Sequence, residues 1–287
     1  MRAVFLALSL AAIGTSCAAR VTQFHNFAEA GVNYVKASAA VLDEAGTAAI
    51  RADSMILADG RAALSPDERR TRLLASNKAL RERMTLLRDL GRHNRLLQRY
   101  FEALAAIADS TAPDAAAAAA ENLFTSLGGL SAAIKSNPIL KSGVPQVTKL
   151  VVGSFRSRAL EQELRRRADA VAAELALQEA AYTAIGELLT ADLTVQLNKV
   201  ESNQVVTPFA QEGTLPKEWI ATREQFLKST AAAASTDAAA KAAKALRESF
   251  EALVSNRFSI TAMTSLLGEM REMASVAGAA AMVTREE

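Results

Sequence analysis

Apolar side chains recur every three or four residues along most of this chain, which is the spacing of an amphipathic helix. The pattern is clearest from Pro66 to Asp109, where an apolar stripe keeps a seven-residue register. The stripe consists of Leu73, Leu80, Leu87, Asn94, Phe101 and Ala108, accompanied by Leu90, Leu97 and Leu104. Further apolar residues beside the stripe widen it, which favours a multi-helix bundle over an isolated two-stranded coiled coil.

The start of this helix carries the most specific local signal in the chain. Ser65 is a good cap, Pro66 suits the first helical position, and Glu68 stands three residues after the cap. A serine and a glutamate at this spacing can each bond the other's backbone N–H in a capping box. We therefore predict that the helix begins at Pro66.

Three other segments in the first two hundred residues also show helical spacing. They are 21–57, 115–135 and 147–200. Prolines and a glycine between residues 136 and 145 predict a turn region before the last of them. Together these segments predict an all-α fold, an elongated helical bundle over residues 17–200. We expect its two long helices, 66–109 and 147–200, to pack antiparallel like a coiled coil.

The remaining third of the chain divides into three parts. Residues 201–215 contain Pro208 and Gly213 and are predicted to form a linker. Residues 216–276 are predicted to form C-terminal helices that pack on the bundle. The last residues, 277–287, are predicted to be a frayed tail.

The N-terminus is typical of an exported bacterial protein. Arg2 precedes an apolar run of about 11 residues, which is too short to span a bilayer and predicts a signal peptide over residues 1–16. The residues Gly14-Thr15-Ser16-Cys17 resemble a lipobox, although Gly14 stands where such boxes usually carry an aliphatic residue. This resemblance implies that Cys17 becomes the lipidated first residue of the mature chain.

Two other fates of this segment stay open. An ordinary signal peptidase would cut after Ala18 or Ala19 and discard Cys17, or the segment would be retained as a buried helix. With Cys17 lipidated, two or three acyl chains would attach the protein stably to a membrane. By the same resemblance, Ala18 in place of Asp implies an outer-membrane lipoprotein facing the periplasm in a Gram-negative source. Without lipidation we expect a soluble periplasmic or secreted protein.

Composition adds to this picture. Of the 287 residues 62 are alanine, which favours long helices packed closely through small side chains. With one cysteine, a structural disulfide within the chain is excluded. The near balance of 33 Lys+Arg and 31 Asp+Glu opposes nucleic-acid binding. Locally, however, residues 66–99 are basic and residues 168–198 are acidic, which predicts complementary helices in one bundle.

The basic segment includes a stripe at helical spacing opposite its apolar face. The stripe consists of Arg88, Arg92, Arg95 and Arg99. One interpretation is a solvated side or a side that faces a partner helix. The other is an anionic-surface stripe that binds lipid headgroups or another acidic polymer of the cell envelope.

Catalytic and metal chemistry is not indicated. The only histidines are His25 and His93, with no second histidine or cysteine placed to complete a zinc site, and no cofactor motif occurs. We interpret His93 as a polar residue at a helix interface, and Asn94 as a polar residue that sets helix register or lies near the surface. An enzyme would require a buried carboxylate or histidine cluster between these two residues and the helix 147–200.

These observations predict an exported, lipid-anchored structural or interaction protein of the bacterial cell envelope, without catalytic activity. Its expected partners are the membrane, through the anchor, and an envelope protein or a second copy of the chain. A first alternative is a helical pore-forming protein that uses the apolar hairpin 123–155, which Lys135, Lys141 and Lys149 interrupt. A second alternative is an enzyme of unknown class.

Overall fold

The computed structural model describes residues 4–109, 113–140, 144–155, 157–233, 236–257 and 260–284, and these ranges contain helices and no strand. The all-α class and the helical bundle are therefore confirmed. In chain order the helices are α1 (Val4–Gly60), the 3-10 turn η1 (Arg61–Ala63), α2 (Pro66–Asp109), α3 (Pro113–Lys135), α4 (Arg158–Val200), the π-helix η2 (Glu201–Val206), α5 (Thr207–Ala210), α6 (Trp219–Ala233), α7 (Ala238–Val254) and α8 (Ile260–Thr284).

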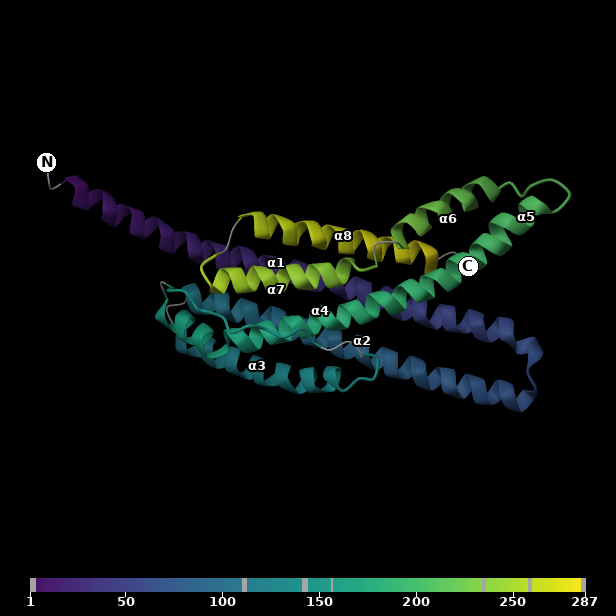
Figure 1. The fold of residues 1–287 in the computed structure, drawn as a ribbon, viewed down its shortest axis with the longest axis horizontal. Coiled ribbons are helices and arrows are strands. Elements are labelled where there is room, and N and C mark those ends of the chain that lie inside the picture. The colour runs from purple at the N-terminus through teal and green to yellow at the C-terminus, as the bar shows by residue number, and fades with distance from the viewer. Residues whose placement is uncertain are drawn as a thin grey trace.

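The helices lie roughly along one long axis (Figure 1). Helix α2 packs mainly against α1 and α3, whereas α4 packs mainly against α7, and α8 covers α1 and α7. The two long helices α2 and α4 lie antiparallel, as expected, since their side chains meet from Arg83 and Asp192 to Tyr100 and Glu163. Each has its main partner elsewhere, however, so they do not form the principal pair of the bundle. Short connections before and after α2 make its chain neighbours its antiparallel partners.

The core combines aromatic rings with many alanines. Phe27 of α1, Phe101 of α2 and Phe250 of α7 are buried, with ring centroids 4.9 to 6.0 Å apart. Helices α1 and α7 also bury alanine faces. Fully buried examples are Ala45, Ala48, Ala49 and Ala52 of α1 and Ala238, Ala239, Ala242 and Ala243 of α7. Small side chains thus line part of the buried face of each of these helices.

The predicted start of α2 is confirmed. The Ser65 backbone N–H donates to Glu68 Oε2 at 2.8 Å, and the Glu68 N–H lies 3.4 Å from Ser65 Oγ. Pro66 is the first residue of the helix. The capping box therefore satisfies two backbone donors that the helix itself leaves without partners.

The long helix predicted from residue 147 begins later, at Arg158. Residues 144–155 are non-helical, and Ser157 caps α4 by accepting the Leu160 N–H. Backbone N–H groups of residues 144–155 donate instead to side-chain carboxylates and to a carbonyl at the end of α7. The Leu150 N–H donates to Asp169 at 2.7 Å, and the Gly153 N–H donates to the Val254 carbonyl at 2.9 Å. Pro145 and the β-branched residues after it disfavour the helix that the apolar spacing suggested.

The predicted linker 201–215 is largely helical as well. The π-helix η2 continues α4 without a break, and α5 carries the chain to Ala210, with Pro208 in its first turn, where proline is tolerated. The indole of Trp219 stacks on Phe209 at 5.4 Å and donates to the Val205 carbonyl at 2.9 Å. These contacts fold α6 back onto η2.

The tail is also more regular than expected. The backbone of α8 is helical to Thr284, within the segment predicted to be a frayed tail. None of the described helices is both long enough and apolar enough to cross a membrane.

The first third of the α2 stripe lies outside the core. Leu73 and Leu74 are exposed, and the buried residues of α2 begin at Arg83. Ser76 Oγ donates to Asp53 of α1 at 2.5 Å, which ties the two helices together in this region. The end of the α1–α2 hairpin therefore projects beyond the bundle, as the blue pair of helices in Figure 1 shows.

Candidate functional site

A buried polar layer crosses the centre of the bundle. It consists of Ser38 from α1, His93 and Asn94 from α2, Ser131 from α3, and Glu174, Gln178 and Tyr182 from α4. Each of these residues is at most 9% exposed. Because buried polar groups are costly unless they are hydrogen-bonded, these residues are expected to bond one another. They do so with one exception, Gln178 Oε1, which has no partner in the described part of the chain.

His93 and Glu174 form one half of the layer. His93 Nε2 lies 2.9 Å from Glu174 Oε2, and Ser131 Oγ bonds the same carboxylate oxygen. Gln178 Nε2 approaches the other ring nitrogen of His93, Nδ1, at 3.3 Å. Both ring nitrogens of His93 therefore have polar partners, a carboxylate and a hydroxyl at Nε2 and an amide at Nδ1.

Asn94 forms the other half. Its Nδ2 donates to Ser38 Oγ at 2.8 Å and to the Tyr182 hydroxyl at 2.6 Å, and its Oδ1 accepts from Gln178 Nε2. Asn94 therefore connects α1, α2 and α4, and is buried rather than near the surface. This places it among the register-setting residues that the sequence suggested.

The layer meets the condition set above for an enzyme, a buried carboxylate and histidine between His93, Asn94 and α4. Its geometry nevertheless differs from that of a catalytic triad. Ser131 Oγ and Glu174 Oε2 both contact Nε2 of His93, whereas a triad places nucleophile and carboxylate on opposite ring nitrogens. His93 also has no exposed surface.

The surroundings change the acidity of two members of the layer. Burial alone raises the pKa of Glu174, but hydrogen bonds from His93 and Ser131 outweigh it, so the net pKa lies below its ordinary value. Burial raises the pKa of Tyr182 to about 12, against the opposing effect of its hydrogen bonds. Glu174 is thus held as a carboxylate and Tyr182 as a neutral phenol at neutral pH.

Sequence reasoning missed Ser131, Glu174 and Gln178. A signal existed for Gln178, which occupies the seven-residue position between Val171 and Ile185 on α4. Asn94 interrupts the apolar row of α2 in the same way, and the two amides bond each other. Polar residues that interrupt two apolar stripes are thus candidates to face one another.

A second buried group joins α2, α3 and α4 around Arg167. Its guanidinium bonds Glu163 at 2.7 Å and also bonds Glu121, and it lies 5.4 Å from the centre of the Phe124 ring. Tyr100 completes the group, 3.3 Å from Glu163. These contacts satisfy an arginine that is only 7% exposed.

The acidic stretch of α4 finds its partners on several helices. Arg83 of α2 pairs with Asp192 at 2.5 Å, while Glu179 pairs with Arg247 of α7 at 2.9 Å. Burial raises the pKa of Asp192, although Arg83 partly offsets it. Among the described residues, the expected complement between α2 and α4 is therefore made by the Arg83–Asp192 pair and by the polar layer, while other acidic residues of α4 pair with other helices.

All four residues of the arginine stripe are exposed: Arg88, Arg92, Arg95 and Arg99. Arg88 contacts Asp89, the residue next to it, at 3.1 Å. Among the described residues no carboxylate pairs with the other three. The stripe therefore presents positive charge to the surroundings of the bundle.

The side chain of Cys17, the predicted lipidation residue, lies outside the described side chains, as do all side chains of residues 1–21, so the structure does not test that prediction. The first core residue of α1 among the described side chains is Phe24. Within the described residues no group of three or more histidine, cysteine or acidic side chains is arranged to hold a metal ion.

The apolar hairpin 123–155 packs against the core. Phe124, Leu150 and Phe155 contact buried residues, and the Phe155 ring meets Phe24 edge-on at 5.6 Å. Val151 is the exception, at 81% exposed. Release of this hairpin into a membrane would therefore expose part of the core.

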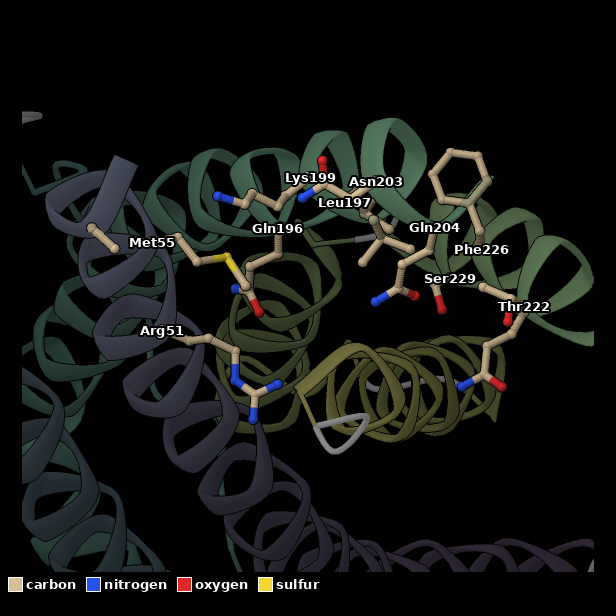
Figure 2. A pocket seen from close by; sticks show the side chains of 13 residues that line it. Arg51, Met55, Gln196, Leu197, Lys199, Asn203, Gln204, Thr222, Phe226 and Ser229 are labelled. Atoms are coloured by element: carbon tan, nitrogen blue, oxygen red, sulfur yellow. The ribbon is translucent and has the colours of Figure 1, made fainter. Parts of the chain in front are cut away.

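A cavity of about 270 Å³ lies between α1, the end of α4, η2 and α6 (Figure 2). Its polar lining includes Arg51, Gln196, Lys199, Asn203, Gln204 and Ser229. Met55, Leu197 and Phe226 add apolar surface. No sequence pattern pointed to it, because its residues come from four elements that only the fold brings together.

Comparison of the chain with protein-family models, curated proteins and solved structures finds no match. Functional inference therefore rests on the residues themselves.

Proposed function

We propose that this protein is exported and anchored by lipid on Cys17, and that it acts as a structural or interaction protein of a bacterial cell envelope, at the periplasmic face of an outer membrane. Its rigid helical body would serve as a spacer or docking partner. Support for a structural rather than catalytic role comes from the polar layer, whose geometry does not fit a triad.

One observation carries the proposal. The export-like segment ends in Ser16-Cys17, and the first described core residue, Phe24, follows seven positions after the cysteine. Cleavage before Cys17 would leave every described core residue in the mature chain. A lipid-modified Cys17 would then be joined to the bundle by the few residues before Phe24.

Metabolic labelling with a palmitate analogue tests the anchor in bacteria that express the full chain. We expect label on the wild type and none on Cys17→Ala. Mass spectrometry of the purified chain gives a second readout, because lipoprotein processing predicts a modified Cys17 at the N-terminus. A mature chain that begins at Ala19 or Arg20 would show export without a lipid anchor. A chain that still begins at Met1 would overturn the proposal of export.

The arginine stripe supports an interaction with an anionic surface. Its guanidinium groups are exposed and lie on one face of α2, where they can approach lipid phosphates together. Each basic residue near an anionic membrane contributes about 1 kcal/mol of binding. Four such residues would strengthen the attachment to the membrane that the lipid chains on Cys17 provide.

Vesicle co-sedimentation tests this role with the unlipidated Cys17→Ala chain. Replacing Arg88, Arg92, Arg95 and Arg99 by glutamine should weaken binding to vesicles that contain phosphatidylglycerol. The control replaces four other exposed basic residues of α2, Arg70, Arg72, Lys78 and Arg81, and removes the same charge. Equal losses of vesicle binding in both variants would show that only the net charge matters, and the stripe would no longer be part of the proposal.

A further inference from the structure

The cavity beside the π-helix contains a buried acceptor without a donor. Gln196 is 1% exposed, and its Nε2 lies 3.2 Å from the Ala48 carbonyl and 3.3 Å from the Asp192 carbonyl. Since two carbonyls face this nitrogen, the orientation of the carboxamide is determined. The oxygen Oε1 is then left without a hydrogen-bond partner in the described part of the chain.

An unpartnered acceptor of this kind is expensive. Leaving a buried polar atom unsatisfied costs about 1–3 kcal/mol, so such atoms in a native structure call for an explanation. Figure 2 shows the Gln196 carboxamide reaching from α4 towards the region where Arg51 and Met55 of α1 line the same cavity. A ligand O–H or N–H at this place would supply the missing hydrogen bond.

The charge of the lining selects an anion. Arg51 and Lys199 both line the cavity, and no carboxylate does. Lys199 is paired with Asp59, whereas Arg51 has no ion-pair partner among the described residues. A half-buried guanidinium that lacks a carboxylate is well suited to bind one from a ligand, because its fork of N–H donors matches the carboxylate geometry.

The π-helix contributes the side chains Asn203 and Gln204 to the same cavity. Helices of this type are rare and occur often at functional sites. Apolar surface from Leu197, Val200 and Phe226 completes the lining. Ligand pockets commonly combine such apolar walls with a few polar groups, and about 270 Å³ is just below their usual range of about 300–1,000 Å³.

We infer that this cavity binds a small organic carboxylate that also carries a hydroxyl or amine donor. Arg51 binds the carboxylate, Gln196 Oε1 accepts the donor, and the apolar wall contacts the body of the ligand. Since Oε1 itself is buried, the proposal requires a lining side chain to turn aside, and Met55 is the flexible one in the lining. This binding site is separate from the arginine stripe and does not depend on the lipid anchor.

The experiment uses mandelate as the probe, since it joins a carboxylate, an adjacent hydroxyl and an apolar ring. Isothermal titration calorimetry and thermal shift of the wild-type chain should both report binding. Phenylacetate, which lacks the hydroxyl, should bind at least about tenfold more weakly, because Oε1 stays unpaired. Inorganic phosphate should bind more weakly than mandelate, since it lacks a body for the apolar wall.

Variants assign the two contacts. Arg51→Gln should weaken mandelate binding at least about tenfold, whereas Lys36→Gln, which removes an exposed charge from the same helix away from the cavity, should leave it unchanged. Comparing mandelate with phenylacetate tests the proposed contact with Gln196 Oε1. It avoids mutating Gln196, whose Nε2 also bonds the Ala48 carbonyl of α1.

Three results would overturn the inference. The first is no mandelate binding to the wild type at millimolar concentration. The second is equal affinity for mandelate and phenylacetate, and the third is an unchanged affinity in Arg51→Gln.

Discussion

The imidazole of His93 and the carboxylate of Glu174 meet in the centre of the bundle, with 2.9 Å between Nε2 and Oε2. They join α2 to α4, two helices that each pack mainly against other helices. Because both side chains are buried, their hydrogen bonds restrict how these helices can slide past each other. Four predictions test this and the other interactions that hold the bundle together.

The first prediction concerns pH and the two buried carboxylates of α4. The pKa of Glu174 is lowered by folding, so its contribution to stability is present above the unfolded pKa and is lost as the pH falls through the folded value. The pKa of Asp192 is raised, so its contribution is present below the unfolded pKa and is lost as the pH rises through the folded value. Between acid and neutral pH the two residues therefore act with opposite sign.

Urea denaturation of Glu174→Gln and Asp192→Asn at several pH values between acid and neutral measures this difference. The loss of unfolding free energy in Glu174→Gln should grow as the pH rises, and the loss in Asp192→Asn should shrink. Parallel pH profiles for the two variants would show that one of the two environments is wrongly assigned.

The second prediction concerns Asn94, whose amide holds Ser38, Gln178 and Tyr182 together. In Asn94→Ala these buried groups lose a partner, so we expect the free energy of unfolding to fall by about 2–4 kcal/mol. Asn26→Ala is the control, because Asn26 is exposed on α1, and it should change stability by less than about 0.5 kcal/mol. A loss as small as the control's would mean that the polar layer tolerates a gap.

The third prediction compares two arginines of α4. Arg167 is 7% exposed and pairs with Glu163, which is also 7% exposed, whereas Arg165 is 57% exposed and pairs with Glu161. Removing one partner of a buried pair costs about 3–5 kcal/mol, so Arg167→Ala should be strongly destabilising. Arg165→Ala should cost less than about 1 kcal/mol. Both variants remove one positive charge from α4, so a difference between their melting temperatures in thermal denaturation reports the effect of burial. Similar melting temperatures would contradict the prediction.

The fourth prediction concerns close packing between α4 and the turn that precedes α7. A Cβ on Gly186 would lie 2.9 Å from the Thr236 carbonyl oxygen, so Gly186→Ala should cost about 1–3 kcal/mol through overpacking. Nothing lies within 4 Å of a Cβ on Gly129 of α3, so Gly129→Ala should instead stabilise the chain by about 0.5–1 kcal/mol. Opposite shifts of the denaturation midpoint are expected, and a neutral Gly186→Ala would require α7 to move away.

Much of the helical structure could be predicted from local signals. The capping box at Ser65 and Glu68 determines where α2 begins, because its bonds form between neighbours in the chain. The same reasoning was wrong for residues 147–155, where apolar spacing suggested a helix. There Asp169 and the Val254 carbonyl, both distant in sequence, bind the backbone instead.

The candidate sites divide in the same way. The exposure of the arginine stripe follows from its position opposite an apolar face, so one helix is enough to predict it. The contact between Asn94 and Gln178 needs two helices in a particular register, and the cavity at Arg51 and Gln196 needs four elements. Neither long-range arrangement could be read from spacing along one helix.

The sequence by itself determined that this chain forms long helices, where α2 starts, and which N-terminal residues are typical of export, because these depend on interactions within a few residues. Only the tertiary structure decided which helices are partners, that His93 and Asn94 are buried, and that Gln196 is left with an unpaired acceptor. Burial and pairing depend on residues that are far apart in the chain, and packing alone brings them together.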